Sequence, residues 1–268
     1  MARHAVAERV ALAAAATWRG RNRHLDGHLV DERDGLVISL SGLPAPAFSG
    51  AAIEREPEDA PAALGWAEQI FRSRGASLGV VVERGRHPTV ERALAAMDLG
   101  VISTELAMAV ETRRVSPPLP IDGLEVRRAT SVEDLDAMAT LEVDAFGTDA
   151  ETAGGFFSTG ILEQPAVSLY VARFDGVAVS MTYTQTHGGS LGVFGVATAR
   201  SARGRGYATA ITATAILEGR RDGADLAWLQ ASRIGVPVYQ RMGFEAVSTW
   251  EVWVRSARPA RAGAGTTS

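Results

Sequence analysis

A repeat within the chain is the feature that most constrains its fold. The segment "RRDGADLAWLQAS" (Arg220–Ser232) resembles "RSRGASLGVVVER" (Arg72–Arg84), which lies 148 positions earlier. Further on, "EAVSTWEVWV" (Glu245–Val254) resembles "GVISTELAMAV" (Gly100–Val110). Each copy predicts a helix that ends near a glycine, then a short apolar strand, a helix and another strand. Two resemblances in the same order indicate a duplicated unit rather than chance.

The length and the linker agree with two units. A chain of 268 residues is long for one domain and suits two of about 130 residues each. The segment "ETRRVSPPLPIDG" (111–123) carries prolines and a glycine between two apolar runs, which is typical of a linker. We therefore expect one domain over residues 1–115 and a second over residues 121–256. The polar tail, residues 257–268, is expected to be disordered.

The second unit alternates strand and helix patterns. Strand "LEVRRA" precedes helix "SVEDLDAMATLEVDAF", in which Ser131 and Asp134 fit a capping box. Three strand-like runs, separated by Asp-Gly and Gly-Gly turns, follow over residues 166–198, after a segment (145–160) expected to form loops. Helix, strand, helix and strand complete the unit. The predicted fold class is α/β (α+β), with two domains, each a mostly antiparallel central sheet flanked by helices.

Composition excludes several classes of protein. The chain has no cysteine, which excludes a thiol nucleophile, a disulfide framework and a zinc–thiolate site. It has no lysine either, so all 27 cationic side chains are arginines, which indicates a GC-rich bacterial gene and a cytoplasmic protein. The net charge of −4 argues against nucleic acid as a partner. The apolar run Val10–Trp18 is too short for a membrane span and has the spacing of a surface helix, so no membrane partner is expected.

The segment "VATARSARGRGYATA" (Val196–Ala210) leads from a strand pattern through a glycine turn into a helix pattern. Gly204 and Gly206 have no Cβ, so a ligand can approach the main chain there. The positive end of a helix attracts anions, phosphate above all. Without lysine this is not a P-loop, and Thr209 stands where a dinucleotide fingerprint needs a small residue. A surface turn without a ligand also fits the hexapeptide alone.

Two motifs around this turn carry a family resemblance. Residues 203–208 (RGRGYA) match Q/R-x-x-G-x-G/A, the pyrophosphate motif of the GNAT superfamily of acyl-CoA N-acyltransferases. The segment "VYQRMGF" (Val238–Phe244) is similar to the family's "LYEKxGF". The resemblance covers roughly residues 123–255. It implies an acetyl-CoA-dependent N-acetyltransferase whose acceptor is a primary amine of a small molecule, attacking directly in a ternary complex.

The resemblance also implies roles for single residues. The family's pantetheine arm lies like an extra strand in a splay of the sheet, here against Val196, Ala197 and Thr198. The main chain would hold the pyrophosphate, with the arginines adding charge, at Arg203, Gly204, Arg205, Gly206, Tyr207, Ala208 and Thr209. Ser232 stands where the family often has Asn, and would contact the pantetheine. Tyr239 matches the family's general acid, which protonates the departing thiolate; a packing role for this ring is the alternative.

No general base can be chosen from the sequence. An ammonium must lose a proton before it attacks, and the strand "LGVFGVAT" has no acid where many family members have one. Glu142, Asp144 and His187 are candidates by position. A solvated helix face explains the two acids equally well, and an exposed hairpin turn explains the histidine better.

The first unit is expected to be a degenerate copy without a cofactor site. The repeat aligns residues 203–208 with 55–60 (REPEDA), where glutamates replace both glycines and three acids would repel a pyrophosphate. Leu94 aligns with Tyr239. The first unit then completes the acceptor cleft, packs on the second unit, or makes a homodimer contact. In architecture alone, the chain also resembles tandem members that acetylate amino-sugar conjugates. A non-catalytic acyl-CoA sensor or scaffold is the alternative function. The absence of an identifiable base favours this alternative, whereas Tyr239 favours an enzyme.

Overall fold

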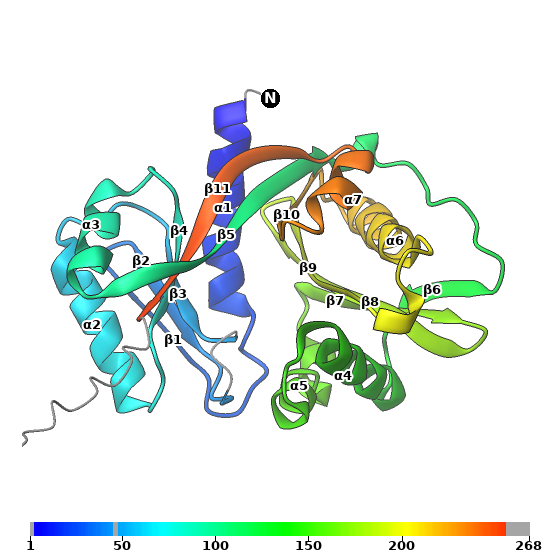
Figure 1. Ribbon diagram of the computed structural model, residues 1–268, viewed down its shortest axis with the longest axis horizontal. Coiled ribbons are helices and arrows are strands. Elements are labelled where there is room, and N and C mark those ends of the chain that lie inside the picture. The colour runs from blue at the N-terminus through cyan, green and yellow to red at the C-terminus, as the bar shows by residue number, and fades with distance from the viewer. Residues whose placement is uncertain (1–2, 45–47, 256–268) are drawn as a thin grey trace, which may run out of the picture.

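The computed structural model describes residues 3–44 and 48–255, and it contains one eleven-stranded sheet (Figure 1). The strand order is β1-β2-β3-β4-β11-β5-β10-β9-β8-β7-β6. Only the β3–β4 and β9–β10 pairs are parallel among the described strands, and the others are antiparallel. The α/β fold class, with a mostly antiparallel sheet flanked by helices, is confirmed. The tail predicted to be disordered lies outside the described residues.

The elements recur in the order that the repeat predicts. The first part of the chain contains α1 (Arg3–Gly20), β1 (Leu29–Arg33), β2 (Leu36–Leu40), β3 (Gly50–Ile53), α2 (Ala60–Ser73), β4 (Gly79–Glu83), α3 (Pro88–Ala96) and β5 (Leu99–Glu111). The second part contains β6 (Leu124–Arg128), α4 (Val132–Phe146), α5 (Ala150–Phe156), β7 (Val167–Phe174), β8 (Val177–His187), β9 (Ser190–Thr198), α6 (Tyr207–Arg221), β10 (Leu226–Ala231), α7 (Val236–Arg241) and β11 (Glu245–Arg255). Short 3₁₀ turns lie at η2 (Thr112–Arg114), η3 (Thr159–Glu163) and η4 (Arg200–Ala202). The segment 145–160, expected to form loops, thus contains α5.

The two parts exchange their last strands. Strand β5 lies between β11 and β10, and β11 lies between β4 and β5. Residues 106–111 of β5 pair with β10, while residues 99–109 pair with β11, and both pairings are antiparallel. Each part therefore completes the sheet of the other. The division into separate domains at residues 115 and 121 stays a prediction.

Helix α1 is more buried than its sequence predicts. The expectation of a surface helix is wrong, because one side packs under the middle of the sheet, where α1 crosses behind β5 and β11 in Figure 1. Its alanines pack with Trp228 and Trp250, two large rings from the second part of the chain. Small side chains allow this close approach. No described helix, α1 included, combines the length and the apolar character that crossing a membrane requires.

The strands of the second part send alternate side chains to two helical layers. In β7, Leu169 and Val171 pack in one cluster with α4 and α5. Tyr170 and Ala172 pack in another cluster with α6. Successive side chains of a strand point to opposite faces, so α4 and α5 cover one face of the sheet and α6 covers the other.

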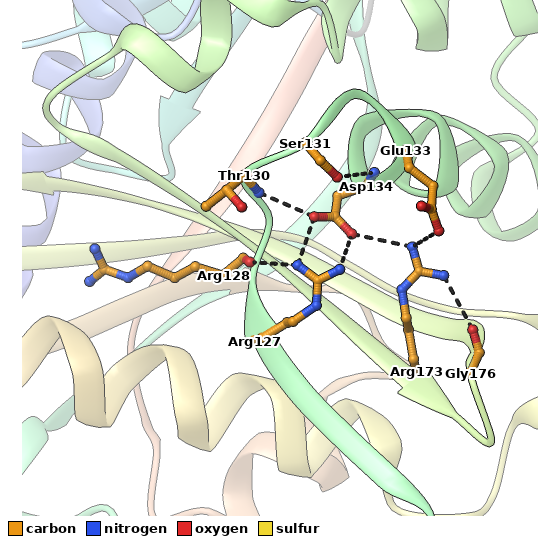
Figure 2. A network of polar contacts seen from close by, with 8 residues as sticks. All are labelled: Arg127, Arg128, Thr130, Ser131, Glu133, Asp134, Arg173 and Gly176. Carbon is orange, nitrogen blue, oxygen red and sulfur yellow. Dashed lines mark hydrogen bonds and ion pairs between the residues drawn. The ribbon is translucent and has the colours of Figure 1, made fainter.

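A buried carboxylate fixes the start of α4 (Figure 2). The Asp134 side chain is 0% exposed and accepts hydrogen bonds from Arg127 at 2.7 and 2.8 Å and from Arg173 at 3.2 Å. It also accepts one from the Thr130 N–H, while the Ser131 hydroxyl accepts from the Asp134 N–H. Burial alone would raise the pKa of Asp134, but these hydrogen bonds lower it to about 2. The Ser131 half of the predicted capping box is therefore present. The Asp134 carboxylate bonds the Thr130 N–H rather than that of Ser131, and it ties α4 to β6 and β7.

Candidate active site

Strands β9 and β10 separate after three paired residues. They pair in parallel only from Ser190–Gly192 with Leu226–Trp228, although β9 stays paired with β8 to Thr198. The Ala199 N–H donates to the Val179 carbonyl of β8 at 2.9 Å. Because backbone groups of alternate residues point to opposite sides of a strand, those of Thr198 face the side towards β10, and its carbonyl accepts from Arg203 Nε at 3.3 Å. Those of Ala197 face β8, where its carbonyl accepts from Ser180 Oγ at 2.6 Å.

A β-bulge lies in β9 beside this gap. The register with β8 shifts between Ala197 and Phe194, and Gly195 within the shift has φ +57°. Thr182 Oγ1 donates to the Phe194 carbonyl at 2.8 Å and holds the bulge. A Cβ at Gly195 would lie 3.0 Å from Tyr183 Cε1, so the Tyr183 ring lies against the backbone at the bulge.

The glycine turn after β9 leads into an uncapped helix. Gly204 and Gly206 have φ +79° and +85°, and Gly206 is the N-cap of α6 with no side chain bonded to the helix end. A Cβ at Gly204 would meet no atom within 4 Å. Arg203 and Arg205 are exposed beside the turn, whereas the Tyr207 ring is only 2% exposed and packs on Phe174. The backbone N–H groups of the first turn of α6 thus lie at an open, positively charged surface.

The corresponding helix end in the first part of the chain is capped by a carboxylate. Asp59 is the N-cap of α2 and accepts from the Ala62 N–H at 2.9 Å. Glu56 accepts from the Thr89 N–H at 3.1 Å and contacts the His87 ring at 2.8 Å. Asp59 therefore occupies the place where α6 is open, whereas Glu56 bonds the start of α3. Leu94, aligned with Tyr239, is a fully buried core residue.

Ser232 and Tyr239 lie across the gap from Val196 and Thr198. Ser232 follows the end of β10, and parallel strands end at the same edge of a sheet. A Cβ at Gly235 would lie 3.0 Å from Tyr239 Cε2 and 3.5 Å from Ser232 Oγ, so both side chains flank Gly235. Burial raises the pKa of Tyr239 to about 12. Among the described residues, no protein group forms a hydrogen bond with its hydroxyl. The ligand contacts predicted for these residues stay predictions.

The three candidate bases have different surroundings. Asp144 Oδ2 accepts from the Arg200 N–H at 2.7 Å, so this acid holds the turn after β9. His187 is exposed in the β8–β9 hairpin, at the opposite end of β9 from Thr198. Glu142 is 9% exposed on the inner side of α4. Burial raises its pKa, although a hydrogen bond from Thr148 and the charge of Arg21 act in the opposite direction. Only Glu142 combines burial near the sheet with a raised pKa.

Comparisons with known proteins identify the second part of the chain. Residues 125–247 match the family model described as an acetyltransferase (GNAT) domain. A GCN5-related N-acetyltransferase from Kribbella flavida is 25% identical, with a TM-score of 0.72 over 93% of this chain and 95% of that chain. A GCN5-related N-acetyltransferase from Sphaerobacter thermophilus is 16% identical, with a TM-score of 0.60 over 84% of this chain and 81% of that one.

A third solved structure, a tandem GNAT protein from the clavulanic acid biosynthesis pathway, is 16% identical, with a TM-score of 0.61 over 92% of this chain and 86% of that chain. A search of curated proteins found no match. The open α6 turn, the diverging β9 and β10 and the matched family model lead to one conclusion. The chain contains an acetyltransferase domain of the GNAT superfamily, over residues 125–247.

Proposed function

We propose that the protein is an N-acetyltransferase that moves an acetyl group from acetyl-CoA to the primary amine of a small molecule. The observation that carries this proposal is the uncapped N-terminus of α6 at Gly206, exposed beside the gap between β9 and β10. When bound, acetyl-CoA supplies an acyl group activated as a thioester. A cytoplasmic location is part of the proposal.

The residues around the turn fit a diphosphate and an extended arm. Backbone N–H groups from Gly204 to Thr209 can donate to phosphate oxygens, because α6 has no side-chain cap to compete for them. Arg203 and Arg205 add two positive charges at the surface. We assign the backbone groups of Val196 and Thr198, beside this gap, to pairing with amide groups of the pantetheine arm.

We assign the proton transfers of the reaction to two ionisable groups, Tyr239 and Glu142. With a pKa of about 12, Tyr239 holds its proton at Oη throughout the neutral range, and no described protein group competes for it. It can give this proton to the leaving sulfur. Burial raises the pKa of Glu142, which makes its carboxylate a better acceptor for a proton from the ammonium. Since the chain has no cysteine, the amine attacks directly rather than through an acyl-cysteine.

A pair of glycine substitutions tests the proposal. Gly206→Glu places a carboxylate at the open end of α6, whereas Gly223→Glu places one just past the other end, at a glycine that also has positive φ. Both replacements cost about 1–2 kcal/mol in backbone strain. We expect the wild type to release CoA thiol when it is given acetyl-CoA and a panel of primary amines. This release should be lost in Gly206→Glu and retained in Gly223→Glu. Equal loss in both variants would contradict the assigned donor site. Acetyl-CoA binding without thiol release for any amine would favour the sensor.

A further inference from the structure

The first part of the chain contributes to the face of the bulge opposite α6. The ring of Tyr183 lies against Gly195 and stacks on Phe194, with centroids 5.5 Å apart. The ring of Phe156, in α5, packs against the Tyr183 ring and stacks on the Phe48 ring, with centroid distances of 5.6 and 4.4 Å. Phe48 precedes β3 in the first part of the chain. A continuous aromatic layer therefore joins the bulge to the first part.

Arg21, just past the end of α1, lies on this layer. Its guanidinium carbon is 4.9 Å from the Trp18 ring centroid and 5.7 Å from that of Phe48. Its Nε is buried without a hydrogen-bond partner, and no carboxylate among the described residues lies within 4.0 Å of its nitrogens. In contrast, Arg19 binds both Glu32 and Glu54. Buried N–H donors are nearly always paired. The unpaired Nε therefore leaves Arg21 with an unused donor, although its side chain also interacts with the Tyr183 hydroxyl.

Two further buried polar atoms near the end of α1 are also unpaired. His24 Nε2 contacts the Phe156 carbonyl at 2.8 Å, but its Nδ1 is buried and has no partner. Gln185 Oε1 of β8 is likewise buried and unpartnered, and a Cβ at Gly20 would clash with that side chain. The region between α1 and β8 therefore contains hydrogen-bonding atoms that no protein group satisfies. Such atoms are available to bind a polar molecule.

Glu142 provides the opposite charge. Burial raises the pKa of Tyr183, Arg21 opposes this shift and Glu142 adds to it, so both charges act on the same hydroxyl. Arg21 and Glu142 nevertheless form no ion pair with each other. Two opposite charges that face one aromatic ring without pairing fit a ligand that carries both charges, with its ammonium towards Glu142 and its anion towards Arg21.

We propose that the acceptor is an amino carboxylate, and that Arg21 of the first part binds its carboxylate while Glu142 receives the proton of its ammonium. The planar guanidinium matches a carboxylate with two parallel hydrogen bonds. The ammonium first loses one proton to Glu142. The neutral amine then attacks, so that the nitrogen–carbon bond forms as the carbon–sulfur bond breaks and the sulfur takes the Tyr239 proton. The second proton of the amine, released as the amide forms, passes through water to Tyr239 and restores its phenol. This inference rests on the proposed function and assigns the first part of the chain a role in the acceptor site.

The test compares pairs of acceptors on the full chain. Each α-, β- or ω-amino carboxylate is paired with the amine that has hydrogen in place of the carboxylate. For the wild type we expect at least one amino carboxylate with a KM about 10- to 100-fold lower than its partner amine, since charged hydrogen bonds contribute this much. Calorimetry of the same molecules on protein saturated with CoA should show the same preference in Kd.

Variants of two arginines locate the effect. Arg21→Gln should remove the preference for the amino carboxylate and leave the Kd of acetyl-CoA within about twofold, whereas Arg21→Lys should retain part of the preference. Arg23→Gln is the matched control, because Arg23 is exposed and donates only to the Arg19 carbonyl. Melting temperatures verify that each variant folds. If Arg21→Gln does not fold, Arg21→Lys is used for the test in its place.

Three results would overturn the inference. They are equal use of both members of every pair by the wild type, an equal rise of both KM values in Arg21→Gln, and the same change in Arg23→Gln. Acetylation of carboxylate-free amines without any preference would contradict this inference and leave the proposed function intact. Failure of acetyl-CoA to bind, with no amine acetylated, would instead contradict the proposed function.

Discussion

Replacing Asp134 by Asn should destabilise the protein in a pH-dependent manner. The pKa of this buried carboxyl is about 2 in the folded protein, against an ordinary value of 3.8. That difference corresponds to about 2 kcal/mol of unfolding free energy, present while the carboxylate is ionised. Because the folded-state pKa is the lower one, this stabilisation is complete above about pH 5. It declines as the pH falls through 4 towards 2, with about half left at pH 3.

Urea unfolding, followed by tryptophan fluorescence, measures this difference at pH 7, 4 and 3. Asp134→Asn should be less stable than the wild type by about 2 kcal/mol at pH 7, with a smaller gap at pH 3. Asp136→Asn is the control, since Asp136 is exposed on the same helix and an exposed substitution changes stability by no more than about 0.5 kcal/mol. A gap that is as large at pH 3 as at pH 7 would refute the assignment of the stabilisation to the ionised carboxylate.

Three shorter predictions concern the site and its counterpart. Tyr239→Phe should lower kcat by about 10- to 1000-fold with an unchanged Kd for acetyl-CoA; an unchanged kcat would mean that the ring only packs. Burial raises the pKa of Glu142, so its ionisation destabilises the folded state as the pH rises through that value. Glu142→Gln should therefore melt higher than the wild type at pH 8 and lose most of its activity, and a lower melting temperature at pH 8 would contradict this. Asp59→Ala should cost about 1 kcal/mol in urea unfolding, as the loss of a helix cap does, without an effect on acetyl-CoA binding to the intact protein; a second binding site in this variant would show that Asp59 alone closes α2.

Local patterns predicted the elements that form the donor side of the site. The strand pattern that ends at Thr198 and the glycines before Tyr207 place β9 and α6 within a residue or two of their observed ends. These signals are local, since a positive φ at Gly204 and Gly206 and the alternation of apolar residues depend on few neighbours. The helix α5, which follows Asp149, was harder to predict from the sequence, because it has only seven residues.

Features that depend on distant pairing could not be predicted. Residue pattern alone does not indicate that β5 lies between β10 and β11, because the pattern fixes which face a strand buries and not which strand lies beside it. The burial of α1 follows from the same exchange, since alanines meet Trp228 and Trp250 only after the sheet closes. A piece of the chain starting near residue 121 would lack β5, a neighbour of both β10 and β11.

The acceptor side was largely missed for a related reason. Arg21 belongs to no motif, and only the fold places it near Glu142, far along the chain. Glu142 was one of three candidate bases, and their surroundings distinguished them: a hydrogen bond to the backbone for Asp144, exposure for His187 and burial for Glu142.

The most direct test of the account is the number of acetyl-CoA molecules that one chain binds. Titration calorimetry on the full chain should give one site, because α6 begins at an uncapped glycine whereas α2 begins at Asp59, its own cap. The same titration on Gly206→Glu should give no measurable site. An added carboxylate repels each phosphate charge by about 1–4 kcal/mol at contact distance, so affinity should fall at least about 30-fold. One site in the wild type and none in Gly206→Glu is the predicted result; two sites, or one that survives Gly206→Glu, would contradict it.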